Sequence, residues 1–185
     1  MDEALDKAIR VFREQGYTAT SIGDLGAAMG LAPGSLYKAF RDKRAIFLAA
    51  LERYQMLRAE QTRRLAEAPR SGRARLEDLL AFYVDSSRGI EGKRGCLAVG
   101  SAVELSLLDP EVAGVVRRNL ARIEAQLADL IRQGQADGSI SRSVDSAATA
   151  RVMLCLMQGL RVVGRAGRPP DDPAAIVAVA MKLLA

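Results

Sequence analysis

The sequence has no histidine and no tryptophan, and it contains only two cysteines, four tyrosines and four phenylalanines in 185 residues. The absence of histidine removes the commonest general base and the commonest metal ligand. Cys96 and Cys155 lie far apart with no neighbouring thiol, so neither a zinc site nor a disulfide framework is indicated. We therefore expect no metal, no cofactor and no enzymatic activity, and two separate thiols suit a reducing cytoplasm.

Long apolar runs are also missing. The longest strongly apolar stretch, residues 152–163, is too short to cross a bilayer and carries Arg161. Residues 1–12 are acidic and amphipathic, unlike the basic start and apolar run of a signal peptide. We expect a soluble, cytoplasmic protein without a membrane partner. The excess of 27 Lys and Arg over 22 Asp and Glu permits an anionic partner without proving one.

Nearly every segment places apolar residues three and four apart, and no segment shows sustained alternation. This spacing predicts an all-α protein of about nine helices. We expect short helices in residues 1–45 to form a first domain and residues 46–185 to form a larger helical bundle. A helix over residues 43–67 is expected to connect the two domains. The segment GIEGKRG at 89–95 is expected to be a loop, and Asp109 with Pro110 is typical of a helix start.

Two short helices separated by a glycine turn occupy residues 20–40. Ser21 and Asp24 have the spacing of a capping box, Gly30 ends the first helix, and the second begins after Pro33. This is the helix-turn-helix pattern, whose second helix lies in the major groove of DNA. Helix–glycine–helix corners also occur in all-α proteins that never bind DNA, so the spacing alone leaves that alternative open.

The local charge favours DNA binding. Residues 32–44 contain four cations and one anion, namely Lys38, Arg41, Lys43, Arg44 and Asp42. Lys43 and Arg44 fall in the first turn of the next helix, where the macrodipole disfavours cations and a bound phosphate would explain them. Leu36 and Phe40 define the buried face of the second helix, which leaves the hydroxyl of Tyr37 able to reach a phosphate.

Residues 20–47, TSIGDLGAAMGLAPGSLYKAFRDKRAIF, resemble the DNA-binding signature of the TetR family of repressors. The shared pattern runs from Thr and Ser before the first helix through small-Leu-Tyr and Phe to a Lys that opens the fourth helix, and the resemblance covers residues 1–54. It departs at Ala39, where many members carry a polar phosphate contact. The resemblance, with the local basic charge, indicates these expected DNA-binding residues: Thr20, Ser21, Pro33, Gly34, Ser35, Tyr37, Lys38, Arg41 and Lys43.

The resemblance further implies a dimer formed by the last two long helices. Residues 152–163 are apolar nearly all round, and the final helix has its own apolar stripe, which is more apolar surface than one protomer core should need. A well-buried central helix is the alternative. The expected interface residues are Met153, Leu156, Gly159, Leu160, Ile176, Val179 and Leu183.

The resemblance also implies a small-molecule pocket in the bundle. Methionine adapts to irregular apolar ligands, although residues at helical spacing also form cores. The expected lining is Met56, Phe82, Tyr83, Cys96, Met153 and Met157. Cys96 follows Lys93 and Arg94 at a helix start, and both features lower a thiol pKa, so Cys96 is a candidate electrophile or oxidant sensor or simply a small buried residue. Cys155 is expected in the core.

Together these observations predict a TetR-like dimeric repressor that a small molecule or electrophile releases from a palindromic operator. The first alternative is an all-α dimeric module that binds a ligand or a protein without specific DNA binding. The second is an enzyme built on a helical bundle.

Overall fold

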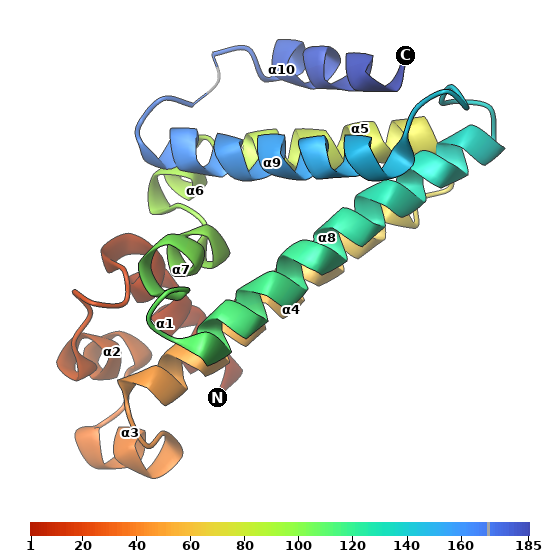
Figure 1. The fold of residues 1–185 in the computed structure, drawn as a ribbon. Coiled ribbons are helices and arrows are strands. Elements are labelled where there is room, and N and C mark those ends of the chain that lie inside the picture. The colour runs from red at the N-terminus through yellow and green to blue at the C-terminus, as the bar shows by residue number, and fades with distance from the viewer. Residues whose placement is uncertain (170) are drawn as a thin grey trace. The chain divides into compact units, whose positions relative to one another are not determined.

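The computed structural model describes residues 1–169 and 171–185. These residues form helices and connecting turns without a strand, which confirms the all-α prediction. Figure 1 traces them in order: α1 (Asp2–Gln15), α2 (Ile22–Met29), α3 (Pro33–Ala39), α4 (Lys43–Ala66), α5 (Gly72–Asp85), α6 (Gly89–Arg94), α7 (Leu97–Leu105), α8 (Pro110–Ala136), α9 (Ser146–Arg165), α10 (Pro173–Ala180) and a 3-10 turn, η1 (Met181–Leu184).

The segment at 89–95, expected to be a loop, contains the short helix α6. Its glycines suggested a turn, but Gly92 has a packing role, because a Cβ there would lie 2.3 Å from the carbonyl oxygen of Ser87. The Gly92 N–H also donates to the carbonyl of Arg88 at 2.8 Å. Close backbone approach, which only glycine permits, therefore sets this extra helical turn.

The chain divides into two compact units. The N-terminal unit comprises Met1–Ala59 and Arg94–Val116, and the C-terminal unit comprises Glu60–Lys93 and Arg117–Ala185. The N-terminal unit therefore contains α7 in addition to the three helices expected for a DNA-binding domain, because α7 packs against α1. Helices α4 and α8 each contribute residues to both units.

The core of the N-terminal unit is built on aromatic rings. Phe12 of α1 meets Phe47 of α4 edge to face with centroids 5.0 Å apart, and Tyr17 meets Phe47 in the same way at 4.9 Å. Leu25 of α2 and Leu36 of α3 are fully buried in the same unit. Edge-to-face pairs stabilise beyond the area they bury, so the rings fix α1 against α4.

Helix α2 and the turn that follows it have the predicted chemistry. The Ser21 hydroxyl accepts from the Asp24 N–H at 3.0 Å, and the Asp24 carboxylate accepts from the Ser21 N–H at 2.9 Å, which confirms the capping box. Gly30 ends α2 in the left-handed region at φ 69°. Pro33 is the first residue of α3, where its missing N–H costs nothing.

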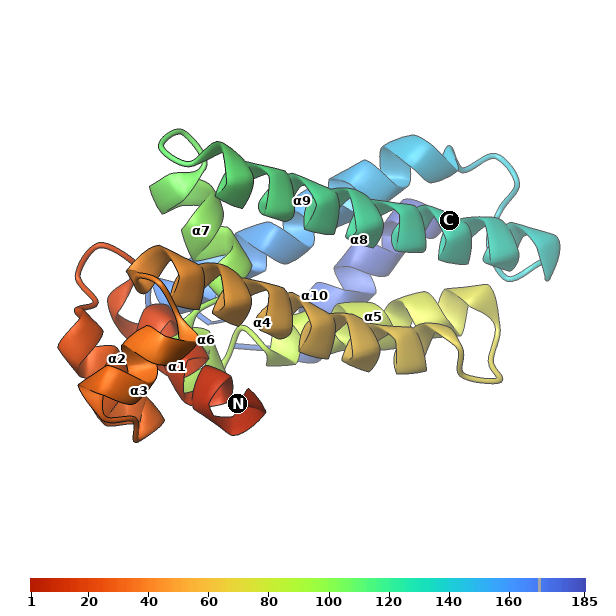
Figure 2. The same cartoon turned by 90° about the horizontal axis from the view of Figure 1, so that it is seen from below.

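The C-terminal unit has its core between α5, α8, α9 and α10. Helix α5 contacts both α9 and α10 (Figure 2). Leu76, Leu127, Met153 and Met157 are fully buried there. Gly164 lets α9 approach the end of α5, since a Cβ at this position would lie 2.2 Å from the Ser87 carbonyl oxygen.

Helix α9 has two contrasting sides. One side is buried and contains Met153, Met157 and Arg161, while Val152 and Cys155 are exposed on the other. The expectation that Cys155 is a core residue is therefore wrong. The apolar stretch at 152–163 is only part of α9, which has 20 residues and is, by length and composition alone, long and apolar enough to cross a membrane, as the core helix of a soluble protein can also be.

Candidate DNA-binding site

Helix α3 leaves almost all of its surface in solvent. Leu36 is 1% exposed and holds the helix to the core, whereas Tyr37 is 59% exposed. The other exposed α3 residues are Pro33, Gly34, Ser35, Lys38 and Ala39. A Cβ at Gly34 would meet no atom within 4 Å, so the first turn of α3 is open. The surface formed by the exposed residues of α3, a helix labelled in Figure 1, is called the α3 face below.

The α3 face carries the expected cations. Lys38 is exposed on α3, and Arg41 follows it with 84% of its side chain exposed. Arg41 contacts only Asp42 among the ion pairs of the described residues, with its Nε 3.0 Å from Oδ2. Asp42 is also the cap of α4, because its carboxylate accepts from the Ala45 N–H at 2.8 Å. That bond and the neighbouring Arg41 hold the pKa of Asp42 below its usual value.

The structure buries Thr20 rather than presenting it to a ligand. The Thr20 side chain is 1% exposed, and its hydroxyl donates to the Gly16 carbonyl at 2.6 Å. Ser21 is exposed, but its hydroxyl is held by the Asp24 carboxylate at 2.6 Å. Thr20 therefore stabilises the connection between α1 and α2, a role that the sequence does not distinguish from phosphate binding.

Lys43 fastens the same connection. Its ammonium donates to the carbonyl oxygens of Tyr17 and Thr20, each at 2.9 Å, and lies 3.5 Å from that of Thr18. It also sits 4.3 Å from the centroid of the Tyr17 ring, within the range of a cation–π interaction. These contacts explain structurally why a cation stands at the start of α4. Residues 16–20, which Lys43 contacts, are called the α1–α2 loop below.

Arg44, the second cation at the start of α4, is engaged with acidic groups. Its Nε and Nη2 donate to the Asp109 carboxylate at 2.5 and 2.9 Å, and Nη2 also donates to Glu111 at 2.7 Å. Asp109 caps α8 by accepting from the N–H groups of Glu111 and Val112. The guanidinium and these N–H groups lower the pKa of Asp109 to about 2. Arg44 therefore joins the starts of two long helices, and no sequence pattern indicated its partners.

Glu104 of α7 completes the attachment of the α1–α2 loop, and sequence reasoning missed it. Its carboxylate accepts from the backbone N–H groups of Tyr17 at 3.0 Å and Thr18 at 2.7 Å. Burial raises the pKa of Glu104, but hydrogen bonds from Thr18 and Tyr17 and the charge of Lys43 lower it by more, so the pKa is below its usual value. The spacing of acidic residues in the sequence does not indicate that Glu104 binds the α1–α2 loop.

The residues expected to line an effector pocket are dispersed. Tyr83, Met153 and Met157 are in the core of the C-terminal unit. Met56 is exposed, and Phe82 is half-buried with its ring 5.7 Å from that of Tyr83. The described residues do contain a cavity of about 450 Å³ between α5 and α10, but none of the six expected residues lines it.

Cys96 lies at the N-cap of α7 and is half-buried. The Tyr54 hydroxyl donates to its Sγ at 3.5 Å, and Arg13 donates to the neighbouring Gly95 carbonyl at 2.6 and 2.8 Å. Arg94, one of the two cations expected to activate the thiol, pairs with Glu14 at 3.0 Å. In the described ranges no group of three His, Cys, Asp or Glu side chains is placed to hold a metal ion.

The expected dimer residues divide by exposure. Met153 is buried inside its own protomer, so a partner could not contact it. Leu156, Gly159, Leu160 and Ile176 are half-buried, whereas Val179 and Leu183 are exposed. Val152, Cys155, Val162 and Val163 are also exposed on α9, and an apolar helix does not reveal from its sequence which side the protomer itself covers.

The attachment of the α1–α2 loop yields a stability prediction. Glu104→Gln places an amide NH₂ against a backbone N–H, so we expect the free energy of unfolding to fall by about 1–2 kcal/mol at pH 7. Because the folded pKa of Glu104 is lowered, its contribution is present above the unfolded pKa and is lost as the pH falls through the folded value. Urea unfolding at pH 7 and near pH 4 measures both effects.

The control for Glu104→Gln is Glu52→Gln. Glu52 is exposed on α4, and no ion pair or side-chain hydrogen bond engages it among the described residues. We expect Glu52→Gln to change stability by no more than about 0.5 kcal/mol. Equal effects of the two substitutions at pH 7 would show that the Glu104 carboxylate does not hold the loop.

Comparison with known proteins agrees with this geometry. Residues 4–50 match the family described as bacterial regulatory proteins, tetR family, and residues 72–179 match the tetracyclin repressor-like C-terminal domain. The chain is 29% identical over 183 residues to the HTH-type transcriptional repressor ComR of Escherichia coli K12, covering 98% of this chain and 87% of ComR. It is 30% identical over 175 residues to the repressor DhaR of Mycobacterium sp. strain GP1, covering 91% and 84%.

A solved structure extends the similarity to a complex with DNA. A cysteine-substituted form of the TetR family regulator CifR, bound to 26-base-pair operator DNA, matches with a TM-score of 0.88 and 27% identity, over 100% of this chain and 96% of CifR. The two matched domains cover most of the sequence, and the helices they require are present. The chain belongs to the TetR family and is a DNA-binding transcriptional repressor, not an enzyme.

Proposed function

We propose that the protein acts in the cytoplasm as a homodimer that binds a palindromic operator through the α3 face and leaves it when an effector binds. The observation that carries this proposal is the α3 face itself, a helix held by Leu36 with Tyr37 and Lys38 in solvent. A recognition helix needs this arrangement to enter a major groove. The operator complex of CifR supports the same mode of binding.

The contacts divide by chemistry. Ser35 and the open first turn at Pro33 and Gly34 face base edges, while Lys38 and Arg41 neutralise phosphates and the Tyr37 hydroxyl donates to one. Thr20 and Lys43 act indirectly, because their polar atoms hold the α1–α2 loop. Ser21 contributes through the start of α2, which its capping box fixes.

Dimerisation is supported by the exposed apolar side of α9 and the outer side of α10. Val152, Val162 and Val163 are each about half exposed, and a Cβ at Gly159 would meet no atom within 4 Å. On α10 and η1, Val179 is 61% exposed and Leu183 43% exposed. Exposed apolar side chains on α9 and α10 are suited to bury against a partner, and a second copy presents the same surface. Two recognition helices then match a palindrome.

Release by an effector is proposed to act on α7. Arg13, Arg94 and Glu104 attach α7 and its flanks to α1 and the α1–α2 loop. A small molecule in the bundle, or an electrophile that alkylates Cys96 at the start of α7, would shift the population toward a state in which these attachments change. The half-buried position of Cys96 against Tyr54 supports the second route.

DNA binding through the α3 face predicts that Tyr37→Ala weakens binding to the selected operator by about tenfold, because the variant cannot donate a hydrogen bond to a charged phosphate. Lys38→Ala should also reduce the slope of log K against log salt by about 0.9 for each phosphate that the variant leaves without a cation. The operator is first selected from a random duplex pool, and affinity is then measured by fluorescence anisotropy over a salt series.

Lys182→Ala is the matched control, because Lys182 is an exposed lysine on η1 in the other unit. It should leave the affinity and the salt slope unchanged. If no sequence is enriched at low salt, or if Tyr37→Ala and Lys38→Ala bind like the wild type, the chain would instead fit a dimeric ligand-binding or protein-interaction module.

The proposed dimer surface predicts that Val162→Glu converts the dimer to a folded monomer at micromolar concentration, because a carboxylate would be desolvated on each side of the interface. Sedimentation velocity measures the mass, and circular dichroism reports the fold. Ile90→Glu places the same charge on an exposed apolar residue of α6 and should remain dimeric. A Val162→Glu protein that stays dimeric would place the interface elsewhere.

The thiol route predicts that N-ethylmaleimide lowers the operator affinity of a Cys155→Ser protein at least tenfold, because the adduct must displace Tyr54 or the Gly95 segment. Cys155 is replaced because its exposed side chain lies on the proposed dimer surface. The Cys96→Ser, Cys155→Ser protein should keep its affinity after the same treatment. An unchanged affinity of the Cys155→Ser protein after complete alkylation would leave only the small-molecule route.

A further inference from the structure

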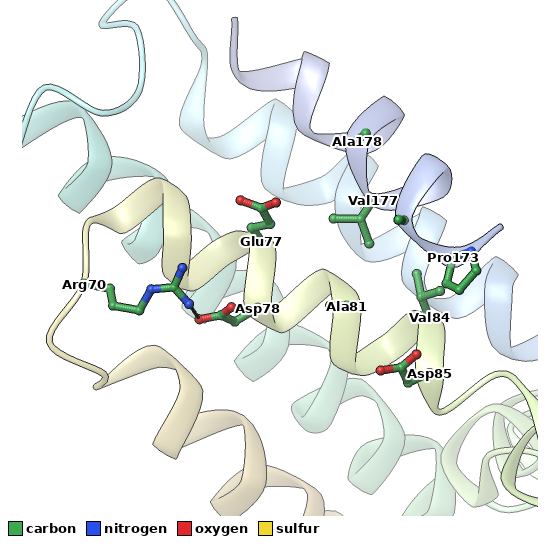
Figure 3. A pocket seen from close by; sticks show the side chains of 10 residues that line it. Arg70, Glu77, Asp78, Ala81, Val84, Asp85, Pro173, Val177 and Ala178 are labelled. Atoms are coloured by element: carbon green, nitrogen blue, oxygen red, sulfur yellow. Dashed lines mark hydrogen bonds and ion pairs between the residues drawn. The ribbon is translucent and has the colours of Figure 1, made fainter.

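A cavity of about 450 Å³ lies between α5 and α10 in the C-terminal unit, within the range of small-molecule sites. We propose that this cavity binds an organic cation that has an apolar body. Figure 3 shows its lining residues on the two facing helices and, for Arg70, on the turn before α5. They are Arg70, Glu77, Asp78, Ala81, Val84, Asp85, Pro173, Ala174, Val177 and Ala178.

The walls of the cavity are apolar and small. Val84 of α5 and Val177 of α10 are buried at its base, and Figure 3 shows Val177 directed from α10 toward α5. Ala81 and Ala178 line the space with methyl groups only, so the two helices leave a gap where larger side chains would have filled it. Such walls suit the hydrocarbon part of a ligand.

The charge around these walls is negative, although the whole chain has a formal net charge of +5. Three carboxylates of α5, those of Glu77, Asp78 and Asp85, line the cavity with a single cation, Arg70. Arg70 forms an ion pair with Asp78, so that pair is neutral overall. Among the described residues, Glu77 and Asp85 have no ion pair and no side-chain hydrogen bond. Figure 3 shows the Glu77 carboxylate on the side of α5 that faces α10.

These features select the class of ligand. An anion would be repelled by two uncompensated carboxylates, and a neutral ligand could donate a hydrogen bond to them but would lack the ionic attraction that a cation gains. A metal ion would need several oxygen ligands that converge, and the described residues contain no group of three acidic, Cys or His side chains so placed. An ammonium group attached to a hydrocarbon body satisfies both the carboxylates and the apolar walls.

The site is separate from the surfaces of the proposed function. Ala174, Val177 and Ala178 line it, whereas Val179 and Leu183, which we assign to the dimer, do not. The α3 face belongs to the other unit. Binding at the cavity can therefore be measured without DNA, and its outcome does not depend on whether the operator model holds.

The test is isothermal titration calorimetry of the full chain with three probes of similar size: benzylammonium, benzyl alcohol and benzoate. We expect saturable binding of the ammonium probe at one site per chain, weakening as salt is raised, and no saturable binding of the other two. Glu77→Gln and Asp85→Asn should each weaken binding about threefold, and the double variant about tenfold, because exposed ion pairs contribute little individually.

Two further variants complete the test. Ala178→Leu extends a side chain into the cavity from an exposed position on α10, so it should abolish binding while the circular dichroism spectrum stays unchanged. Glu52→Gln, an exposed carboxylate in the other unit, should bind the ammonium probe like the wild type. Equal binding of all three probes, or undiminished ammonium binding by folded Ala178→Leu or by the double variant, would overturn the proposal.

Discussion

The N-terminal unit depends on one short stretch of backbone held between opposite charges. The ammonium of Lys43 takes the carbonyl oxygens of the α1–α2 loop, and the carboxylate of Glu104 takes two N–H groups of the same loop. The positive charge of Lys43 meets carbonyl oxygens and the negative charge of Glu104 meets N–H groups. Each is therefore a charge-assisted hydrogen bond, which is stronger than a bond between neutral groups. Because α2 and α3 follow this loop, its position determines where the α3 face points.

This attachment divides the cations near the recognition helix into two groups. Lys43 and Arg44 are committed to the loop and to the cap of α8, while Lys38 and Arg41 extend into solvent. A count of cations in the sequence therefore overstates the number of positive charges that can neutralise DNA phosphates. The contacts of Lys43 hold the loop that precedes α2 and α3, and a surface that is ordered before binding loses less entropy when it binds.

Local rules explain most of what could be predicted correctly from the sequence. The capping box at Ser21, the turn at Gly30 and the helix start at Pro110 all rest on neighbours in the chain, and each is present. Glu104 could not be found in this way, because its partners lie more than 80 residues earlier. Thr20 and Ser21 read alike in the sequence, yet tertiary packing buries one and exposes the other. Helix propensity likewise does not indicate which side of α9 packs against the rest of the protomer.

Helix α10 shows why exposure must come from the fold. Within eight residues it supplies Val177 and Ala180 to the core, Val179 to an exposed apolar surface, and Ala174 and Ala178 to the wall of a cavity. The helix therefore faces three environments, with Val177 at the boundary of the core and the cavity, and every residue after Pro173 is Ala, Val or Ile. The sequence of α10 cannot show which side is buried, because a buried side is recognised by its apolar residues only when the opposite side is polar. The contacts with α5 make the assignment, because burying Val177 fixes the rotation of the whole helix.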